Sequence, residues 1–252
     1  MPLVGTRDVT PLGALSPLLP SFEAPQWELR GATVLQVMYE IEDESMLSLL
    51  PAALHPTIPP TLLFNVTSVP DSPAGPFTLA ELRVGCRSGA RPRGLLVRGY
   101  TDSAAATTEL RTHWGYPLGD AAVVLRKGYD RVHAVVELDG RTILDVALMN
   151  PEPISGGDVQ YLANLNLARV VRGGSEALRL VQVDPDYVFH RADRGGPRLL
   201  AFEADAWGVG GAVPYFPIAA SVTTCDITMP RIRYLVDPAK PPLQAVESVG
   251  QS

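Results

Sequence analysis

The segment Thr108–Ala121, with the sequence TELRTHWGYPLGDA, places a histidine and a tyrosine that can do acid–base chemistry three residues apart. A histidine side chain has an intrinsic pKa near neutrality, so His113 is a residue type that can give or take a proton at physiological pH. A histidine at a helix end also caps the helix dipole, and the sequence leaves both roles open. The hydroxyl group of Tyr116 can contact a substrate, while Tyr116-Pro117 is typical of a turn that shapes a pocket wall. We predict His113 and Tyr116 as candidate catalytic residues.

Glu81 is the third candidate catalytic residue and lies in the apolar run Phe77–Cys86. Side chains alternate between the two faces of a strand, so Glu81 shares a face with Leu79 and Arg83. If Leu79 points into a cavity, Glu81 points the same way and can act as a carboxylate there. The alternative is an ion pair between Glu81 and Arg83 at the surface.

Two arginines are candidate substrate-binding residues. Arg98 lies in the apolar run Gly94–Thr101, on the face predicted for Leu96 and Tyr100, and Tyr100 is a further candidate substrate-binding residue. A guanidinium group there can bind an anionic or keto oxygen in a bidentate manner, or it can form a structural salt bridge. Arg111 lies one turn before the Tyr-Pro pair, where it either contacts substrate or holds its helix in place.

The elements that must position these residues are mostly strands. Asp139-Gly140 is typical of a tight type I′ hairpin turn. Many strands and few helices predict a mainly β protein of the β-rich α+β class, an antiparallel β-barrel or sandwich with rim helices. The predicted helices are Glu44–Ala53 and Ala104–His113, and the strands are Thr33–Glu40, Thr61–Val69, Phe77–Cys86, Gly94–Thr101, Val123–Arg126, Arg131–Leu138, Thr142–Met149, Leu178–Val183, Leu199–Ala204 and Ser221–Tyr234.

The composition restricts the class of protein. At 252 residues the chain is long enough for one large domain with its own core. A net charge of −6 without a basic run argues against nucleic-acid binding. No apolar window is long enough for a membrane span, and no signal peptide is recognisable, so we expect a cytoplasmic protein. Cys86 and Cys225 lack metal-type spacing, and we expect two free thiols, no metal and no cofactor.

Proline usage divides the chain into three parts. Residues 1–26 contain five prolines and are predicted to form an extended arm, lying on the surface or on a neighbouring subunit. Residues 27–237 carry the strand and helix patterns and are predicted to form a single domain. Residues 238–252 are non-periodic and are predicted to form a flexible tail.

Several short motifs occur in an order that resembles the acetoacetate decarboxylase superfamily. They are VMYEIEDESMLSLLPAAL, FNVTSVPDS followed by GPFT, RGYTDS, ELRTHWGYP and CDITMPRIRYLVD, spread over about residues 30–236. The resemblance implies a β-rich fold around a central cavity, and we expect a homo-oligomer. It also implies a site in which a lysine forms a Schiff base with a ketone, beside a second lysine and two glutamates.

The chain departs from that family pattern at the positions that carry the chemistry. Leu118 and Gly119 stand at the lysine pair, and Asn65 and Leu79 stand at the glutamates. The only lysines are Lys127, in a predicted turn, and Lys240, in the predicted tail. Schiff-base chemistry is therefore not expected.

The loss of four charged positions predicts an apolar pocket lined by Leu118, Gly119, Leu79 and Asn65 for a hydrophobic, carbonyl-bearing small molecule. We expect a lysine-independent cyclase, isomerase, dehydratase or pericyclic-type enzyme of specialised, polyketide-like metabolism. Two alternatives stay open. One is a non-catalytic relative that only binds a small molecule, and the other is a decarboxylase- or aldolase-type lyase that uses different residues.

Overall fold

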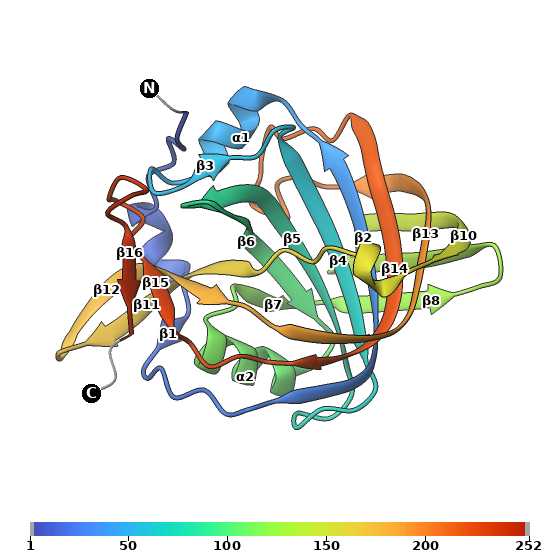
Figure 1. Cartoon of the computed structure of the whole chain (residues 1–252), viewed down its shortest axis with the longest axis horizontal. Helices are drawn as coiled ribbons and strands as arrows, with labels where there is room; N and C mark the ends of the chain where they lie inside the picture. The colour runs from blue at the N-terminus through green and yellow to red at the C-terminus, as the bar shows by residue number, and fades with distance from the viewer. Residues whose placement is uncertain (1–2, 250–252) are drawn as a thin grey trace.

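The computed structural model describes residues 3–249 of the chain, in which sixteen strands form one large, strongly curved sheet (Figure 1). The strands are β1 (Leu18–Leu19), β2 (Glu28–Glu40), β3 (His55–Pro56), β4 (Thr61–Val69), β5 (Phe77–Ser88), β6 (Arg91–Thr101), β7 (Leu118–Asp120), β8 (Ala122–Lys127), β9 (Arg131–Leu138), β10 (Arg141–Ile154), β11 (Asn164–Arg172), β12 (Ser175–Val183), β13 (Asp186–Phe202), β14 (Phe216–Thr228), β15 (Tyr234–Val236) and β16 (Val246–Ser248).

Two α-helices and two short 3-10 helices lie at the ends and edges of this sheet. They are α1 (Asp43–Leu49), α2 (Ala104–Trp114), η1 (Thr10–Leu15) and η2 (Gly156–Asp158). Ser103 caps α2 by accepting a hydrogen bond from the Ala106 amide, and Gly115 ends the helix in the left-handed conformation, with φ 66°. This left-handed stop turns the chain directly into Tyr116 and β7.

The predicted β-rich α+β class is confirmed, but the sheet is not a closed, purely antiparallel barrel. Its main strand order runs β16-β15-β12-β11-β6-β5-β4-β2-β14-β13-β10-β9-β8, with β1, β3 and β7 paired off this path. Three pairings are parallel, namely β1 with β11, β11 with β6 and β6 with β7. Each parallel pairing is made across a crossover of the chain, which alternation within single strands does not reveal.

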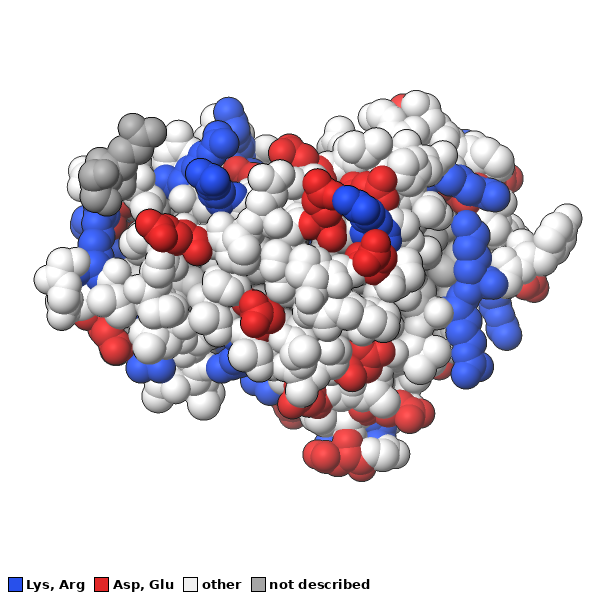
Figure 2. All heavy atoms as spheres, turned by 90° about the horizontal axis from the view of Figure 1, so that it is seen from below, with Lys and Arg blue, Asp and Glu red and all other residues white. Residues whose placement is uncertain are grey.

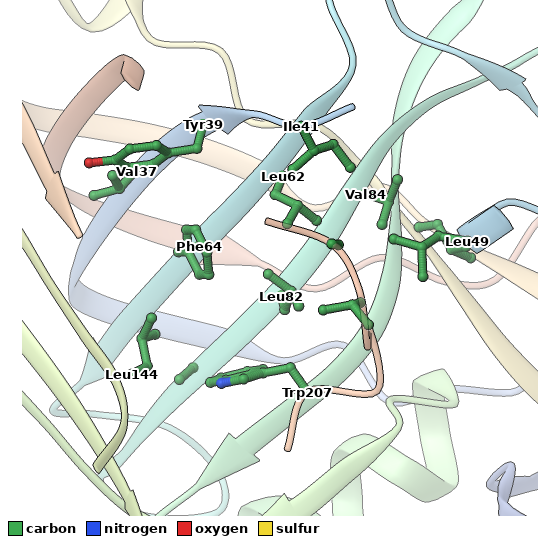
Figure 3. Packing of buried hydrophobic residues seen from close by; sticks show 14 of the residues in the cluster. Val37, Tyr39, Ile41, Leu49, Leu62, Phe64, Leu82, Val84, Leu144 and Trp207 are labelled. Carbon is green, nitrogen blue, oxygen red and sulfur yellow. The ribbon is translucent and has the colours of Figure 1, made fainter. Parts of the chain in front are cut away.

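The core divides between the two faces of the curved sheet. One face packs Phe64, Leu82 and Val84 against α1 and against Trp207, which lies in the loop after β13 (Figure 3). The other face packs Leu79 and Leu118 against Trp114 of α2 and against the N-terminal segment. Because successive residues of a strand point to opposite faces, each central strand contributes to both cores.

The N-terminal segment packs on its own chain. Its first part bonds to the segment that follows α1, with the Gly5 amide donating to Leu54 O over 2.9 Å and the Arg7 amide to Leu50 O over 2.8 Å. Its last part forms β1, which pairs with β11. Residues 8–17 therefore arch between two fixed points, and we call them the arch.

The end of the chain is also packed through residue 249, although we predicted a flexible tail. Strand β16 pairs with β15, and Ala245 is fully buried. Glu247 accepts hydrogen bonds from Arg179 over 3.2 and 3.3 Å, which ties β16 to β12. The remaining part of the predicted tail, residues 250–252, and residues 1–2 of the predicted arm lie outside the described residues.

Figure 2 shows a surface with large uncharged areas, on which several basic side chains lie together at the right edge and several acidic ones at the lower edge. Within residues 3–249, no helix combines the length and hydropathy needed to cross a membrane.

Candidate active site

Five side-chain positions line up in one row across the middle of the sheet. Gln36 of β2 lies opposite Asn65 of β4, which lies opposite Glu81 of β5. Glu81 in turn lies opposite Gly99 of β6, and Gly99 opposite Leu118 of β7. Because paired residues share a face of the sheet, these five positions face the same side. Candidates from three distant parts of the sequence therefore meet in a single row.

Glycine at position 99 makes room for Leu118 next to Glu81. A Cβ atom built on Gly99 would lie 2.5 Å from Leu118 Cδ2 and 3.8 Å from Glu81 Cγ. Leu118 is 4% exposed and Glu81 is 3% exposed, so both are sealed from solvent. Leu118 thus forms the apolar boundary of the space around the Glu81 carboxylate.

Glu81 anchors a buried hydrogen-bond network. Arg83 Nη2 donates to Glu81 Oε2 over 2.5 Å, and Arg83 Nη1 donates to the Leu162 carbonyl over 3.1 Å. Asn164 Nδ2 donates to Glu81 Oε1 over 3.0 Å and to the Tyr116 hydroxyl over 3.3 Å. The ion pair with Arg83 is therefore buried within the protein, and removing one partner of such a pair typically costs about 3–5 kcal/mol.

The electrostatics of this network keep Tyr116 neutral and Arg83 charged. Burial is the main cause that raises the pKa of Tyr116, and the Glu81 carboxylate raises it further. Burial by itself would lower the pKa of Arg83, but the charge of Glu81 holds that pKa above its usual value. Tyr116 accepts a hydrogen bond from Asn164 and retains its own proton, so it can donate that proton in a hydrogen bond to a substrate oxygen.

Several buried polar atoms of the row and network have no hydrogen-bond partner among residues 3–249. They are Gln36 Nε2, Asn65 Oδ1, Arg83 Nε and Asn164 Oδ1. An unpaired buried polar atom typically costs about 1–3 kcal/mol, and native structures contain few of them. Their concentration around Glu81 marks this region as polar space that hydrogen-bonding groups of a small molecule would stabilise.

A cavity of about 170 Å³ lies on the other side of Leu118. Strand β6 pairs with β11 at residues 94–96 and with β7 at residues 99–101, which leaves Val97 and Arg98 between the two partners. The cavity opens beside this stretch, on the edge of β6 that faces away from β5. Its walls are mainly apolar and come from β6, from Leu167 and Leu180 of the β11–β12 hairpin, from the arch and from Trp207.

Comparison with known proteins decides the family of this chain. The model of the acetoacetate decarboxylase (ADC) family matches residues 14–188, which is more than half of the sequence. The chain belongs to the acetoacetate decarboxylase family. Comparison with curated protein sequences gave no significant match.

Solved structures of this family share its fold at low sequence identity. A protein described as acetoacetate decarboxylase matches with a TM-score of 0.74 at 16% identity, over 84% of this chain and 89% of the other. The enzyme from Legionella pneumophila matches with a TM-score of 0.70 at 17% identity, over 83% and 86%. An acetoacetate decarboxylase-like enzyme from Sphingomonas wittichii RW1 matches with a TM-score of 0.66 at 15% identity, over 82% and 91%.

A fourth matching structure is that of a biosynthetic enzyme. The enduracididine biosynthesis enzyme MppR, complexed with the condensation product of pyruvate and imidazole 4-carboxaldehyde, has a TM-score of 0.66 at 15% identity. The alignment covers 82% of this chain and 87% of MppR. At these identities the likeness establishes the fold, while the reaction of this chain has to come from its own residues.

The four positions that depart from the family pattern do not all share one cavity. Asn65, Leu79 and Leu118 face the side of the sheet that carries Glu81. Gly119 faces the opposite side, because a Cβ atom there would lie 3.2 Å from Arg98 Nη2 and 3.3 Å from Tyr100 Cε1. The expectation that Gly119 lines the same pocket wall as Leu118 is corrected accordingly, since consecutive strand residues alternate.

Arg98 and Tyr100 also lie on the far side of the sheet from Glu81. A bulge at Val97 shifts the register of β6 against β5, so Leu96 lies opposite Arg83 whereas Arg98 lies opposite Leu82. Leu96 and Arg98 therefore do not share the face that we predicted for them. The Tyr100 hydroxyl donates to Ala206 O over 2.6 Å, so it is engaged by the protein.

The two candidates on α2 have different surroundings. Arg111 Nη1 donates to the Leu118 carbonyl over 2.7 Å and so ties the end of α2 to β7 at the cavity wall. His113 lies one turn after Glu109, with its Nε2 3.2 Å from the Glu109 carboxylate, and both side chains are partly exposed. The structure brings Glu81 and Tyr116 together and leaves His113 outside their network.

Neither lysine is part of this site. Lys127 lies at the end of β8, with its Nζ 3.8 Å from Asp193 Oδ2. Lys240 pairs with Asp237 and Glu247 near the end of the chain. Among residues 3–249, no group of three His, Cys, Asp or Glu side chains has the arrangement of a metal site.

Sequence reasoning missed Asn164, which links Glu81 to Tyr116. Strand β11 was not predicted, although the run NLNLARVV alternates polar and apolar residues as a strand does. It also missed Tyr187 of β13, whose ring lies 5.0 Å from that of Tyr161 at the border of the network. The parallel pairing of β11 with β6 brings Asn164 to the site, and the place of β13 in the sheet brings Tyr187. No local sequence pattern predicts either arrangement.

Proposed function

We propose that this protein is an enzyme that converts an apolar, carbonyl-bearing small molecule without forming a Schiff base. The observation that carries the proposal is the row in which Leu118, at the position of the family's lysine pair, adjoins the buried Glu81 network. Family membership supports an enzyme with a small-molecule substrate, and the absence of lysine from this row supports non-covalent catalysis.

In this proposal Tyr116 is the catalytic residue. The apolar body of the substrate lies in the cavity beside Leu118, and its carbonyl oxygen accepts a hydrogen bond from the Tyr116 hydroxyl. Reactions that build negative charge on a carbonyl oxygen are accelerated by a fixed donor at that point. Cyclisation, isomerisation and dehydration of a ketone all pass through such an enol-like charge distribution.

The remaining residues of the network position this donor. Asn164 Nδ2 donates to both the Tyr116 oxygen and Glu81, which orients the phenol. Arg83 balances the charge of Glu81 in a site closed to bulk solvent. Enclosure itself contributes, because holding a flexible substrate near its attack geometry is worth up to about 7–11 kcal/mol in ideal cases.

A binding protein without catalysis is the second candidate, and one observation favours it. Both carboxylate oxygens of Glu81 already accept hydrogen bonds from Arg83 and Asn164, so this carboxylate is satisfied within the protein. In a binder, the network would hold the fold together and Leu118 would only shape the cavity.

The test combines trapping with one conservative substitution. Borohydride treatment in the presence of acetoacetate or pyruvate should give no adduct on either lysine. Turnover of a panel of apolar ketones and β-keto compounds, followed by NMR, should identify a substrate. Tyr116→Phe should then lower kcat by roughly 10²–10³, as loss of a positioned hydrogen bond does.

The matched control is Tyr215→Phe, which also removes one hydroxyl group. Tyr215 is exposed and donates to Glu40 Oε1 over 2.8 Å, at the end of β2 and outside the row. Its kcat should be unchanged. A stoichiometric lysine adduct, or equal kcat values for both tyrosine variants and the native protein, would contradict this mechanism, and ligand affinity without any product would favour the binding protein.

A further inference from the structure

Three arginines line the cavity beside Leu118, and no carboxylate from the described part of the chain lines it. Arg7 comes from the N-terminal segment, Arg98 from β6 and Arg111 from α2, while the other lining residues are uncharged. Within residues 3–249, none of these three guanidinium groups forms a salt bridge. Arg98 is exposed and Arg7 and Arg111 are partly buried, so three cations without a counter-ion from this part of the chain lie beside the apolar wall.

Two of these groups converge on one peptide unit. Arg111 Nη1 donates to the Leu118 carbonyl over 2.7 Å. Arg98 Nη2 lies 3.2 Å from the position that a Cβ atom of Gly119 would take, which is open because residue 119 is a glycine. Both guanidinium groups therefore lie beside the Leu118–Gly119 peptide. Like charges repel each other, and an anion bound by both groups would be attracted to each of them.

The third arginine comes from the segment that covers the cavity. Arg7 is half-buried, and its backbone amide donates to Leu50 O, which fixes its Cα at the start of the arch. Burial lowers the pKa of Arg7, and no carboxylate among residues 3–249 pairs with it to counteract this effect. Arg7 also precedes residue 14, where the match to the family model begins. It is therefore a feature of this chain outside the matched region.

We infer that this cavity binds an apolar carboxylate, with its acid group between Arg7, Arg98 and Arg111 and its apolar body against Leu118 and Trp207. A guanidinium group offers two parallel N–H donors that match the two oxygens of a carboxylate. A cavity of about 170 Å³ is close in size to cavities that hold one benzene ring. The ligand class is thus a monocarboxylate with a body of roughly one aromatic ring.

This inference deepens the proposed function by naming the charged group of the ligand, and it rests on that function only for the shared cavity. Leu118 lines the cavity and also adjoins the Glu81 network, so the cavity and the network share this side chain. Binding can be measured whether or not the ligand is turned over.

The experiment compares three probes with the same ring and chain by isothermal titration calorimetry. They are 3-phenylpropionate, 3-phenylpropan-1-ol and 3-phenylpropylamine. The acid should bind at least about tenfold more tightly than the alcohol, the amine should bind most weakly, and the preference for the acid should shrink as salt is added. Arg98→Gln and Arg7→Gln should each weaken acid binding by about tenfold and leave alcohol binding unchanged, since a charge-assisted hydrogen bond is lost only for the acid.

Arg131→Gln is the matched control, because Arg131 is exposed on β9 and does not line this cavity. It should leave the affinity for the acid at its native value. Equal affinities for acid and alcohol, or equal losses in the Arg98, Arg7 and Arg131 variants, would overturn the inference and leave the Tyr116 mechanism standing. Arginine-dependent acid binding without an effect of Tyr116→Phe on turnover would support the inference and count against the mechanism.

Discussion

At the scale of single residues, the packing of the site depends on Gly99 and Leu118 together, because each residue fits only in the presence of the other. Gly99 has no side chain, and the space above it is filled by Leu118 Cδ2. A methyl group on residue 99 would meet that atom at 2.5 Å and the Ala80 carbonyl oxygen at 3.0 Å. The leucine side chain can move or be truncated, whereas the backbone carbonyl stays in place. A change at Leu118 can therefore relieve the first clash but not the second.

Gly99→Ala should therefore destabilise the protein, and a second substitution should relieve part of the loss. In the background of Leu118→Ala, the Gly99→Ala change should cost at least about 0.5 kcal/mol less than in the native chain, as coupled neighbours do. Leu118→Ala alone should cost about 2–5 kcal/mol as a buried leucine. Chemical denaturation of the four proteins of this cycle measures both values.

Gly196→Ala is the control for this cycle, because the nearest atom to its new methyl group would be Met149 O at 3.9 Å. Its cost should be the same in the native chain and in the Leu118→Ala background. Strict additivity of Gly99→Ala and Leu118→Ala would mean that these residues do not share the space described here.

At the scale of elements, the sequence predicted the strands of the site more accurately than their arrangement. The predicted ranges of β4, β5 and β6 agree with the structure within a few residues, because each is a long apolar run bounded by turn residues. Asp139-Gly140 forms the expected turn, with φ values of 53° and 75°. These are local features, and local patterns are sufficient to predict them.

The position of Gly119 follows from strand alternation, whereas the positions of Arg98 and Asn164 have a non-local cause. The bulge at Val97 moves Arg98 to the other face, and neither its position nor its existence follows from an apolar run. Asn164 reaches Glu81 because β11 pairs in parallel with β6, with Asn164 opposite Gly94. Predicting the polar network from sequence would have required this pairing, and predicting Arg7 would have required the fold of the arch.

The position of the arch can be tested by a substitution at Gly5, which lies just before it. Gly5 lies so close to the end of α1 that a Cβ atom would lie 2.0 Å from Leu50 O, a backbone atom that cannot move aside easily. Gly5→Ala should lift the start of the arch and shift Arg7 away from the cavity. We expect weaker binding of 3-phenylpropionate by several-fold and faster amide hydrogen exchange in Val9–Ser16.

Gly157→Ala is the matched change, because its methyl group would make an ordinary contact of 3.6 Å with Ser155 Oγ. It should alter neither the binding nor the exchange of the arch. Unchanged exchange in Gly5→Ala, with the protein folded, would show that the arch does not depend on this contact.

At the scale of the whole molecule, acid sensitivity should concentrate at the two carboxylates that join distant strands. Asp226 of β14 accepts hydrogen bonds from the Gly31 amide over 2.7 Å and from His190 Nε2 over 2.9 Å, and both lower its pKa. Burial would raise the pKa of Glu247, but hydrogen bonds and charge from Arg179 and Lys240 hold it below its usual value. These contacts connect β14 to β2 and β13, and β16 to β12.

The direction of the pH effect follows from these depressed pKa values. A carboxyl group whose pKa is lower in the folded state stabilises the fold fully above its unfolded pKa, which is about 4. That contribution is lost as the pH falls from about 4 through the lower, folded pKa. We therefore expect the midpoint of guanidinium chloride unfolding to be steady between about pH 5 and 7 and to fall below about pH 4.

Arg179→Gln measures how much of the loss of stability in acid is caused by protonation of Glu247. Without the Arg179 guanidinium group the pKa of Glu247 rises toward its usual value, so less stability remains to be lost in acid. The variant should be less stable than the native protein at about pH 7, and the difference between the two should narrow as the pH falls below about 4. Arg131→Gln removes the same charge from a surface position without a carboxylate partner among residues 3–249, and its pH profile should run parallel to the native one. A constant difference between Arg179→Gln and the native protein at all pH values would show that Glu247 does not couple β16 to β12 through its charge.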